Sequence, residues 1–276
     1  MAFYLLPGLY ALLVWWASTA AIILLDNLPR RTHRWSLLGG NAVLAASLYG
    51  LGAVRDDLSM QGVYAGFTFA VLAWGWQEMT FFMGALTGPR RTGASPNASL
   101  ARVFREGVAA SLWHELAIIA TALAIWALSH GGQNWVGLYT FLLLWAMRQS
   151  AKLNFFLGVR NTGEQFVPAH LGYMRSYMRR RPMNMLMPFS ITAGTVLTTV
   201  LGWKAGVPGI SAARAAGLTM LTTMAGLAMI EHWMLIAPVP FDQLWNWVLR
   251  WRRPGLRLQP PASVRNACIA AKGTVP

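Results

Sequence analysis

The sequence predicts an all-α, polytopic membrane protein built as one bundle of seven transmembrane helices. Of its 276 residues, 55% are hydrophobic and only 12% are charged, whereas an ordinary soluble domain has about 25% charged residues. The apolar residues also fall into runs of about 20, the length that crosses the hydrocarbon core of a bilayer. Six to eight such runs would use nearly the whole chain, which leaves no room for a sizeable soluble domain.

The first three predicted spans are separated by short polar turns. The first ends at the polar turn from Asp26 to Arg31, and the third contains a glutamate, Glu78. A stripe of small residues at Ala42, Ala46 and Gly50 predicts that the second span packs closely against another helix. These three spans are residues 3–25, 35–54 and 62–86.

The last four predicted spans follow a longer loop, whose Gly, Pro, Ser and Asn content predicts no internal structure before about Ser99. They are residues 107–128, 135–159, 185–203 and 212–237. With the first three they form a single transmembrane domain, residues 1–254. The remaining residues, 255–276, are polar and contain two adjacent prolines, so we expect a disordered cytoplasmic tail.

The distribution of Lys and Arg predicts the orientation of the bundle. The loops after the first, third, fifth and seventh spans hold three, four, five and six of these residues, and the opposite side holds only Arg55, Lys204 and Arg214. By the positive-inside rule, the N-terminus is expected in the periplasm and the C-terminus in the cytoplasm. The net charge of +14 is therefore assigned to topology and to contact with anionic lipid, and we expect no nucleic-acid partner.

Two cytoplasmic segments are predicted to be amphipathic helices in the headgroup layer. In the first, Val167, Leu171, Met174 and Met178 recur at helical spacing, and a similar pattern runs from Phe241 to Trp251. The basic residues of these segments are expected to face lipid or a partner protein: Arg175, Arg179, Arg180, Arg181, Arg250, Arg252 and Arg253.

Two cations, Arg148 and Lys152, lie inside the predicted span 135–159. They are four residues apart and so share one face of the helix. Each would cost about 2.5 to 3.5 kcal/mol at the centre of a lone helix in lipid. That face is therefore expected to meet acidic groups.

Other spans carry ionisable residues at a similar distance from their cytoplasmic ends. At about 1.5 Å per residue, four spans bring such groups roughly 9 to 15 Å inside the cytoplasmic boundary. The predicted intramembrane polar layer consists of Glu78, His114, Glu115, Arg148, Lys152, Glu231 and His232. It is expected to bind a pigment, to contact a partner, or to hold the helices in register as a structural cluster.

A metal site is an alternative interpretation of the same layer. Its candidate ligands, Glu78, His114, Glu115, Glu231 and His232, match the ligand types of carboxylate-bridged di-iron proteins. The Glu-x-x-His spacing of those proteins is absent, however, and the nearby Arg148 and Lys152 would repel a cation. We therefore expect no metal, and the catalytic residues, if any, are unknown.

A tetrapyrrole site is the other alternative. His114 or His232 would then ligate a central Mg or Fe, or Arg148 and Lys152 would pair with a ring propionate.

From about Phe3 to about Trp251, the sequence resembles the PuhE family, photosynthetic complex assembly protein 2 of purple phototrophic bacteria. The resemblance rests on the strings WWASTAAIILLDNLPRRTHRWS, LAWGWQEMTFFMGALTGPRR, HELAI, WAMRQSAKLNFFLGVRNTGEQFVPAHLGYM, RRRPMN and EHW. It implies a multi-pass protein of the bacterial inner (intracytoplasmic) membrane that supports formation of the reaction centre and its light-harvesting ring and influences bacteriochlorophyll production. It implies no catalytic residues.

The resemblance implies a photosynthetic complex assembly factor rather than an enzyme. Its expected partners are the lipid bilayer, reaction-centre or light-harvesting subunits and pigment-synthesis proteins, and its expected cofactor is bacteriochlorophyll or a Mg-tetrapyrrole precursor. The alternative is a membrane metal-dependent oxidoreductase, or another enzyme, that acts on a bacteriochlorophyll precursor.

Overall fold

The computed structural model describes residues 2–164 and 167–238, and within these ranges it is all-helical, without a named β-strand. The prediction of an all-α fold is thus confirmed for the described residues. The 3₁₀ segments η1 (Arg30–Thr32) and η3 (Ala169–Tyr177) lie in the connections. The long helices are α1 (Ala2–Asp26), α2 (His33–Ala53), α3 (Met60–Phe82), α4 (Leu100–Ser129), α5 (Val136–Leu157), α6 (Leu186–Ala205) and α7 (Ala212–Ile236).

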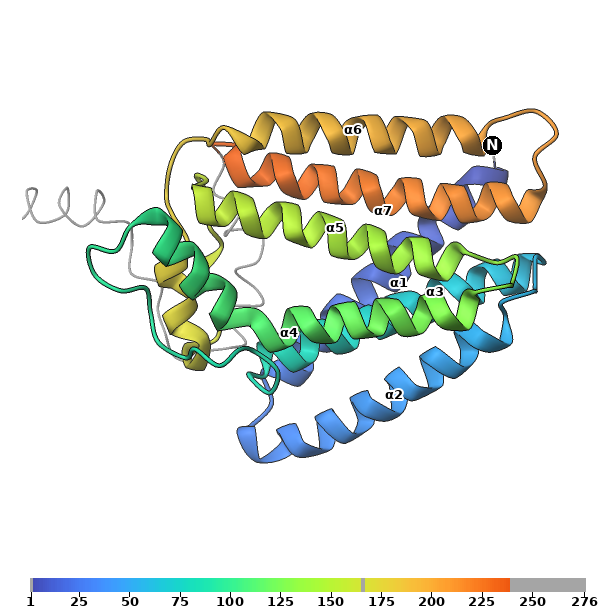
Figure 1. Cartoon of the computed structure of the whole chain (residues 1–276). Coiled ribbons are helices and arrows are strands. Elements are labelled where there is room, and N and C mark those ends of the chain that lie inside the picture. Colours follow the sequence, from blue (N-terminus) through green and yellow to red (C-terminus); the bar gives the residue numbers. More distant parts are fainter. Residues whose placement is uncertain (1, 165–166, 239–276) are drawn as a thin grey trace, which may run out of the picture. The chain divides into compact units, whose positions relative to one another are not determined.

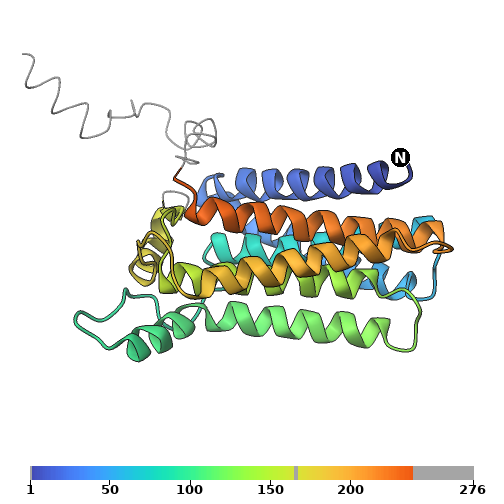
Figure 2. The ribbon, with the colours of Figure 1, turned by 90° about the horizontal axis from the view of Figure 1, so that it is seen from above.

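The long helices lie roughly parallel to one axis, with α1 and α4 on opposite sides of the bundle (Figure 2). Successive helices alternate in direction, so that the connections after α1, α3 and α5 meet at one end (Figure 1, left). These three connections and the helix ends beside them carry twelve Lys or Arg residues, against three at the other end. We call the first of these ends the basic end.

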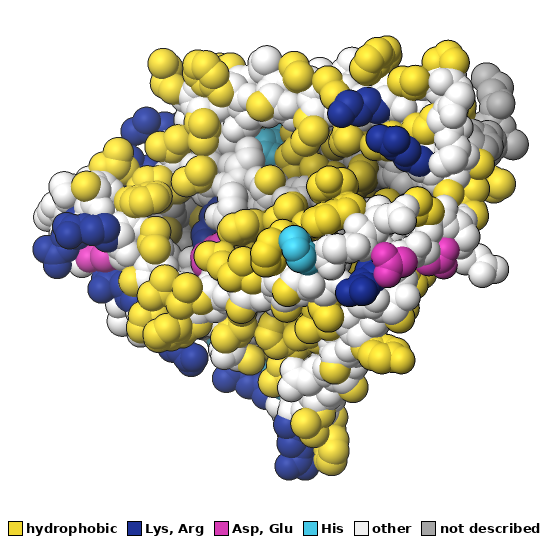
Figure 3. All heavy atoms as spheres, turned by 45° about the vertical axis from the view of Figure 1, so that its right-hand side comes forward, with side chains coloured by type: hydrophobic (Ala, Val, Ile, Leu, Met, Phe, Trp, Pro, Cys, Tyr) yellow, Lys and Arg dark blue, Asp and Glu magenta, His cyan; other side chains and the backbone are white. Residues whose placement is uncertain are grey.

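Five of the long helices are long and apolar enough to cross a membrane, which supports a multi-pass membrane protein. The surface between the basic side chains carries many hydrophobic groups (Figure 3). The other two long helices, α3 and α5, lie between neighbours: α3 packs against α1, α2, α4, α5 and α7. The five apolar segments are Tyr4–Asp26, Arg30–Ala53, Leu100–Ser129, Leu186–Ala205 and Ala212–Ile236.

Helix α3 joins two apolar clusters of the core. In one, Phe67 of α3 packs with Met220 and Met224 of α7. In the other, Ala70 and Ala73 of α3 pack with buried apolar residues of α4 and α5. Burying this apolar surface between helices leaves α3 with little contact to lipid, and so it tolerates polar residues that a lipid-facing helix would not.

Three details of the predicted helices are wrong. Helix α3 ends at Phe82, four residues early, and Gly84 follows with φ of +74°, a left-handed conformation that favours glycine. Helix α4 begins at Leu100, where the Ser99 hydroxyl accepts a hydrogen bond from the backbone N–H of Arg102. In α2, the buried face contains Ser47, Gly50 and Leu51, whereas Ala42 and Ala46 of the predicted stripe are exposed.

The first predicted interfacial helix is a 3₁₀ segment tied to the rest of the protein. Leu171 and Tyr177 of η3 are buried, and Tyr177 packs against Val103 and Ala110 of α4. Beyond η3, Arg180 forms an isolated β-bridge with Val159. The second predicted interfacial helix, Phe241 to Trp251, and the tail 255–276 lie outside the described residues.

The connection between α3 and α4 has no helix or strand, but its segment Thr87 to Arg91 is held against α4. The Thr87 carbonyl accepts a hydrogen bond from the backbone N–H of His114 (2.9 Å), and the Ala109 carbonyl accepts one from Arg90 (3.4 Å). A Cβ on Gly88 would come within 2.1 Å of the Ala109 carbonyl oxygen. The first turns of α4 are inclined to the rest of the helix (Figure 1), as expected where other groups enter a helix ladder.

We predict that Gly88→Ala destabilises the protein because the added methyl group has no space against α4. Forcing one extra carbon into such a contact costs about 2 kcal/mol, which should lower the thermal unfolding temperature of the protein in mild detergent. Gly39→Ala is the matched control, since its Cβ would meet nothing within 4 Å. Equal unfolding temperatures for the two variants would contradict the tight packing of Gly88.

Candidate functional site

The first ion pair of the predicted polar layer joins α3 to α5. Arg148 Nη1 donates a hydrogen bond to Glu78 Oε2 at 2.6 Å, with side-chain exposures of 23% and 13%. The Arg148 guanidinium carbon also lies 5.2 Å from the centre of the Phe81 ring, one turn along α3 from Glu78. The cation is thus held by a carboxylate and by an aromatic face.

The second ion pair joins α4 to α5. Lys152 Nζ donates to Glu115 Oε1 at 2.5 Å and to the Ser111 hydroxyl at 2.8 Å. The other carboxylate oxygen, Glu115 Oε2, accepts from Gln149 Nε2 at 2.5 Å. Ser111 and Glu115 are four residues apart on α4, so one helix face supplies both acceptors for the ammonium group.

The two ion pairs lie beside one another. Glu78 is within electrostatic range of Glu115 and Lys152 as well as of Arg148. Two carboxylates therefore face two cations, and their formal charges cancel. The structure brings these four members of the predicted layer together, and a single charge-balanced cluster, which we call the ion-paired layer, joins α3, α4 and α5.

The two histidines of the predicted layer differ in their environments. His114 is 1% exposed, lies 4.6 Å from the Phe81 ring between centroids, and has no hydrogen-bond partner for either ring nitrogen among the described residues. His232 contacts the Ala228 carbonyl through Nδ1 (2.7 Å) and the Ser150 hydroxyl through Nε2 (2.8 Å). Because a carbonyl only accepts, Nδ1 of the neutral ring carries the proton and Nε2 accepts from Ser150.

Glu231 is within electrostatic range of Glu78 but forms no ion pair with the described residues. It lies on the exposed side of α7, while its neighbour His232 is buried. Adjacent helical residues point about 100° apart, so that packing His232 toward α5 turns Glu231 outward.

The alternative metal ligands do not form a metal-binding group. Within residues 2–164 and 167–238, no three His, Cys, Asp or Glu side chains lie close enough to hold one ion. Both Glu115 oxygens already accept hydrogen bonds from the protein, as described above, and both His232 nitrogens are engaged. The donor set therefore does not fit a metal centre. For a tetrapyrrole, His114 has ring nitrogens without hydrogen-bond partners among the described residues but is 1% exposed, whereas Arg148 and Lys152 are already paired.

Sequence reasoning missed several polar residues that support the layer. Gln77 is fully buried, and its amide donates to the Thr121 hydroxyl of α4 at 2.8 Å. Asn154, also fully buried, donates to the Ser190 hydroxyl of α6 at 2.9 Å. These side chains are neutral, so a search for ionisable residues within the spans passes over them. Gln149 could have been found from its position between Arg148 and Lys152.

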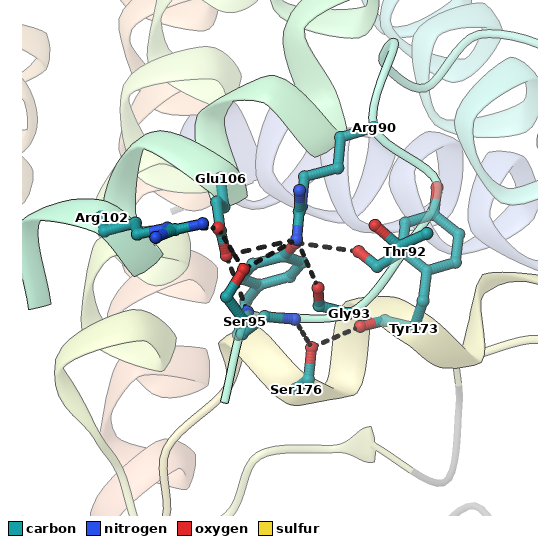
Figure 4. Close-up of polar contacts among 10 residues, drawn as sticks. Arg90, Thr92, Gly93, Ser95, Arg102, Glu106, Tyr173 and Ser176 are labelled. Atoms are coloured by element: carbon teal, nitrogen blue, oxygen red, sulfur yellow. Dashed lines mark hydrogen bonds and ion pairs between the residues drawn. The ribbon is translucent and has the colours of Figure 1, made fainter. Parts of the chain in front are cut away.

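A second polar network at the basic end was also missed. Arg90 donates to the Tyr177 hydroxyl (2.9 Å) and the Gly93 carbonyl (2.8 Å), and it forms an ion pair with Glu106 at 3.4 Å (Figure 4). Glu106 also accepts hydrogen bonds from the Ser95 hydroxyl (2.6 Å) and the Ser95 backbone N–H (2.9 Å). The network fixes the connection between α3 and α4 against η3 and the start of α4.

The basic residues predicted to face lipid or a partner have varied contacts. Arg175 donates to the Val167 carbonyl (2.8 Å), the guanidinium carbon of Arg179 lies 5.9 Å from the centre of the Phe156 ring, and Arg180 pairs with the Glu164 carboxylate. Arg181 is exposed. The other three, Arg250, Arg252 and Arg253, lie outside the described residues.

These features define an all-helical, multi-pass membrane protein whose interior helices are joined by ion pairs. The chain belongs to the DUF3623 family, a family of proteins of unknown function, whose model matches residues 1–255. Over 254 residues it is 37% identical to a Rhodobacter capsulatus protein described as an uncharacterized 30.4 kDa protein in the puhA 5′ region, with 88% of this chain and 90% of that protein aligned. No solved structure shows a significant match.

We predict energetic coupling between Glu78 and Arg148. Arg148→Met leaves a carboxylate in the layer without its main partner and should cost about 3 kcal/mol. The double variant Glu78→Gln/Arg148→Met removes both charges, so its loss should be smaller than the sum of the single losses by at least about 1 kcal/mol. The free energy of unfolding in mild detergent measures the three losses.

Arg160→Gln is the control for this cycle, because Arg160 is exposed at the basic end and should leave the stability unchanged. Strictly additive losses for Glu78 and Arg148 would show that their contact contributes nothing to the fold.

Proposed function

We propose that this protein is an assembly factor of the photosynthetic apparatus in the bacterial inner (intracytoplasmic) membrane, a member of the PuhE family that supports reaction-centre and light-harvesting complex formation and modulates bacteriochlorophyll production. The resemblance described above supports the family, and the description of the Rhodobacter capsulatus relative, which refers to the puhA 5′ region, agrees with it.

The observation that favours a scaffold over an enzyme is that each charged group of the ion-paired layer is paired with an opposite charge from another helix. Glu78 pairs with Arg148 and Glu115 pairs with Lys152, which holds α3, α4 and α5 in register. The one carboxylate oxygen of these pairs that lacks a hydrogen-bond partner among the described residues, Glu78 Oε1, is buried. A catalytic acid or base would need a proton position open to a substrate.

In the proposed topology all seven long helices span the bilayer, with the N-terminus periplasmic and the C-terminus cytoplasmic. The excess of Lys and Arg at the basic end supports this orientation. The basic end would then face an anionic leaflet and the cytoplasmic faces of partner subunits, which we expect to be reaction-centre, light-harvesting or pigment-synthesis proteins.

A role in holding a chlorin is favoured by one specific observation, the environment of His114. A buried imidazole without a hydrogen-bond partner costs about 1 to 3 kcal/mol, and coordination to a central Mg would offset this cost. His114 would hold the Mg through a ring nitrogen, and the chlorin would be bound as cargo from bacteriochlorophyll synthesis.

The assembly role predicts that deleting the gene in a photosynthetic host lowers the yield of reaction centres, because the subunits then lack their assembly factor. Reaction-centre absorption of isolated membranes, per unit of membrane protein, measures this yield. The wild-type gene on a plasmid should restore it, and so should the Arg160→Gln variant as a neutral control. Unchanged reaction-centre and bacteriochlorophyll levels in the deletion strain would exclude the assembly role.

The pigment role predicts that protein purified in mild detergent from pigment-making cells carries a chlorin absorption band, and that His114→Ala loses it. His232→Ala should keep the band, because both nitrogens of His232 already have protein partners. Size-exclusion profiles check that both variants are folded. A colourless wild-type protein that co-purifies with reaction-centre subunits would reject the pigment role and retain the scaffold.

A further inference from the structure

A pocket of about 310 Å³ lies at the basic end, separate from the ion-paired layer. Four stretches that are distant in sequence form it: the start of α2 with η1, the turn after α3, the segment Thr87 to Arg91, and η3. Its polar lining consists of Arg30, His33, Thr87, Arg91, His170 and Tyr173.

The charge of this pocket is positive, and no carboxylate of the described residues compensates it. No Asp or Glu lies in its lining, and neither Arg30 nor Arg91 forms an ion pair with a carboxylate of the described residues. Burial lowers the pKa of His170, and the positive charge of Arg30 lowers it further. The local potential therefore favours an anion.

The two histidines are oriented by backbone carbonyls. His33 Nε2 lies 3.1 Å from the Leu28 carbonyl, and His170 Nε2 lies 2.9 Å from the Phe82 carbonyl. Since carbonyls only accept, both Nε2 atoms carry protons. Each ring is held in place through its Nε2 atom.

Two hydroxyls of the lining lack hydrogen-bond partners among the described residues. They belong to Thr87, which is 2% exposed, and to Tyr173. A buried donor without an acceptor costs about 1 to 3 kcal/mol. Both groups are O–H donors, and the oxygens of an anion would satisfy them after a small movement of the side chains.

We propose that this pocket binds a phosphate group. Arginine forks match phosphate oxygens, and the two arginines stand with two hydroxyl donors around one space. The phosphate can come from the headgroup of an anionic lipid or from a soluble phosphate compound. Arg30 follows the apolar run of α1 closely in sequence, which is where basic pockets meet lipid headgroups. This inference does not depend on the proposed assembly role.

The test uses full-length protein, delipidated in a neutral detergent, and inorganic phosphate as the probe. Phosphate should raise the unfolding temperature beyond the effect of sodium chloride at equal ionic strength. The pocket variant Arg30→Gln/Arg91→Gln should need about tenfold more phosphate, or more, since it loses charged hydrogen bonds. The control Arg31→Gln/Arg160→Gln removes two exposed charges outside the pocket and should respond like the wild type.

A second arm distinguishes the source of the phosphate. The same three proteins are reconstituted in nanodiscs of phosphatidylglycerol and phosphatidylcholine, and retained lipids are identified by native mass spectrometry. Phosphatidylglycerol retained by the wild type and the control but not by the pocket variant identifies a headgroup site. A phosphate response without retained lipid identifies a soluble ligand.

The proposal is overturned if the pocket variant and the control behave alike in both arms, because the effect would then be general electrostatics. Should the pocket variant fail to fold, Thr87→Val/Tyr173→Phe replaces it, since this pair removes only the two unpaired hydroxyls and leaves the charges unchanged. Phosphate binding by that variant equal to the wild type, together with no lipid retention by the wild type, would equally reject the site.

Discussion

The fold depends on the cost of placing charge in lipid. Arg148 and Lys152 on α5 would each be strongly unfavourable if they faced hydrocarbon. Pairing with Glu78 and Glu115 removes this cost only if α3, α4 and α5 pack in one rotational setting. Because buried ion pairs can contribute little net stability compared with apolar packing, their main effect here is to select that setting from other packings of three apolar helices.

The same requirement accounts for the position of the least apolar long helices. Helix α5 contains Arg148, Gln149, Lys152 and Asn154, and α3 contains Gln77 and Glu78. Neither would be favoured against lipid, and α3 has neighbours on most of its surface. The apolar helices α1, α2, α4, α6 and α7 can meet the hydrocarbon and shield α3 and α5. The composition of each long helix therefore matches its position in the bundle.

The helices could be predicted from the sequence because apolar run length and flanking arginines are local signals. The members of the polar layer could be predicted from their depth in the membrane, but the pairs that they form could not. Depth brings Glu231 and Glu78 to the same level, but it says nothing about helix rotation, and burial of His232 turns Glu231 outward. The connection between α3 and α4 could not be predicted, since its order comes from contacts such as Arg90 with Tyr177, 87 residues apart, which leave no periodic pattern.

That connection is also where the two polar regions of the molecule meet. The Thr87 carbonyl accepts a hydrogen bond from the backbone N–H of His114, and the Thr87 side chain lines the pocket of the basic end. Gly88 has no room for a side chain against α4, so Thr87 cannot shift far without moving the backbone of α4. A phosphate that reorients Thr87 would therefore act on the helix that carries His114 and Glu115, through a contact one residue from the ion-paired layer.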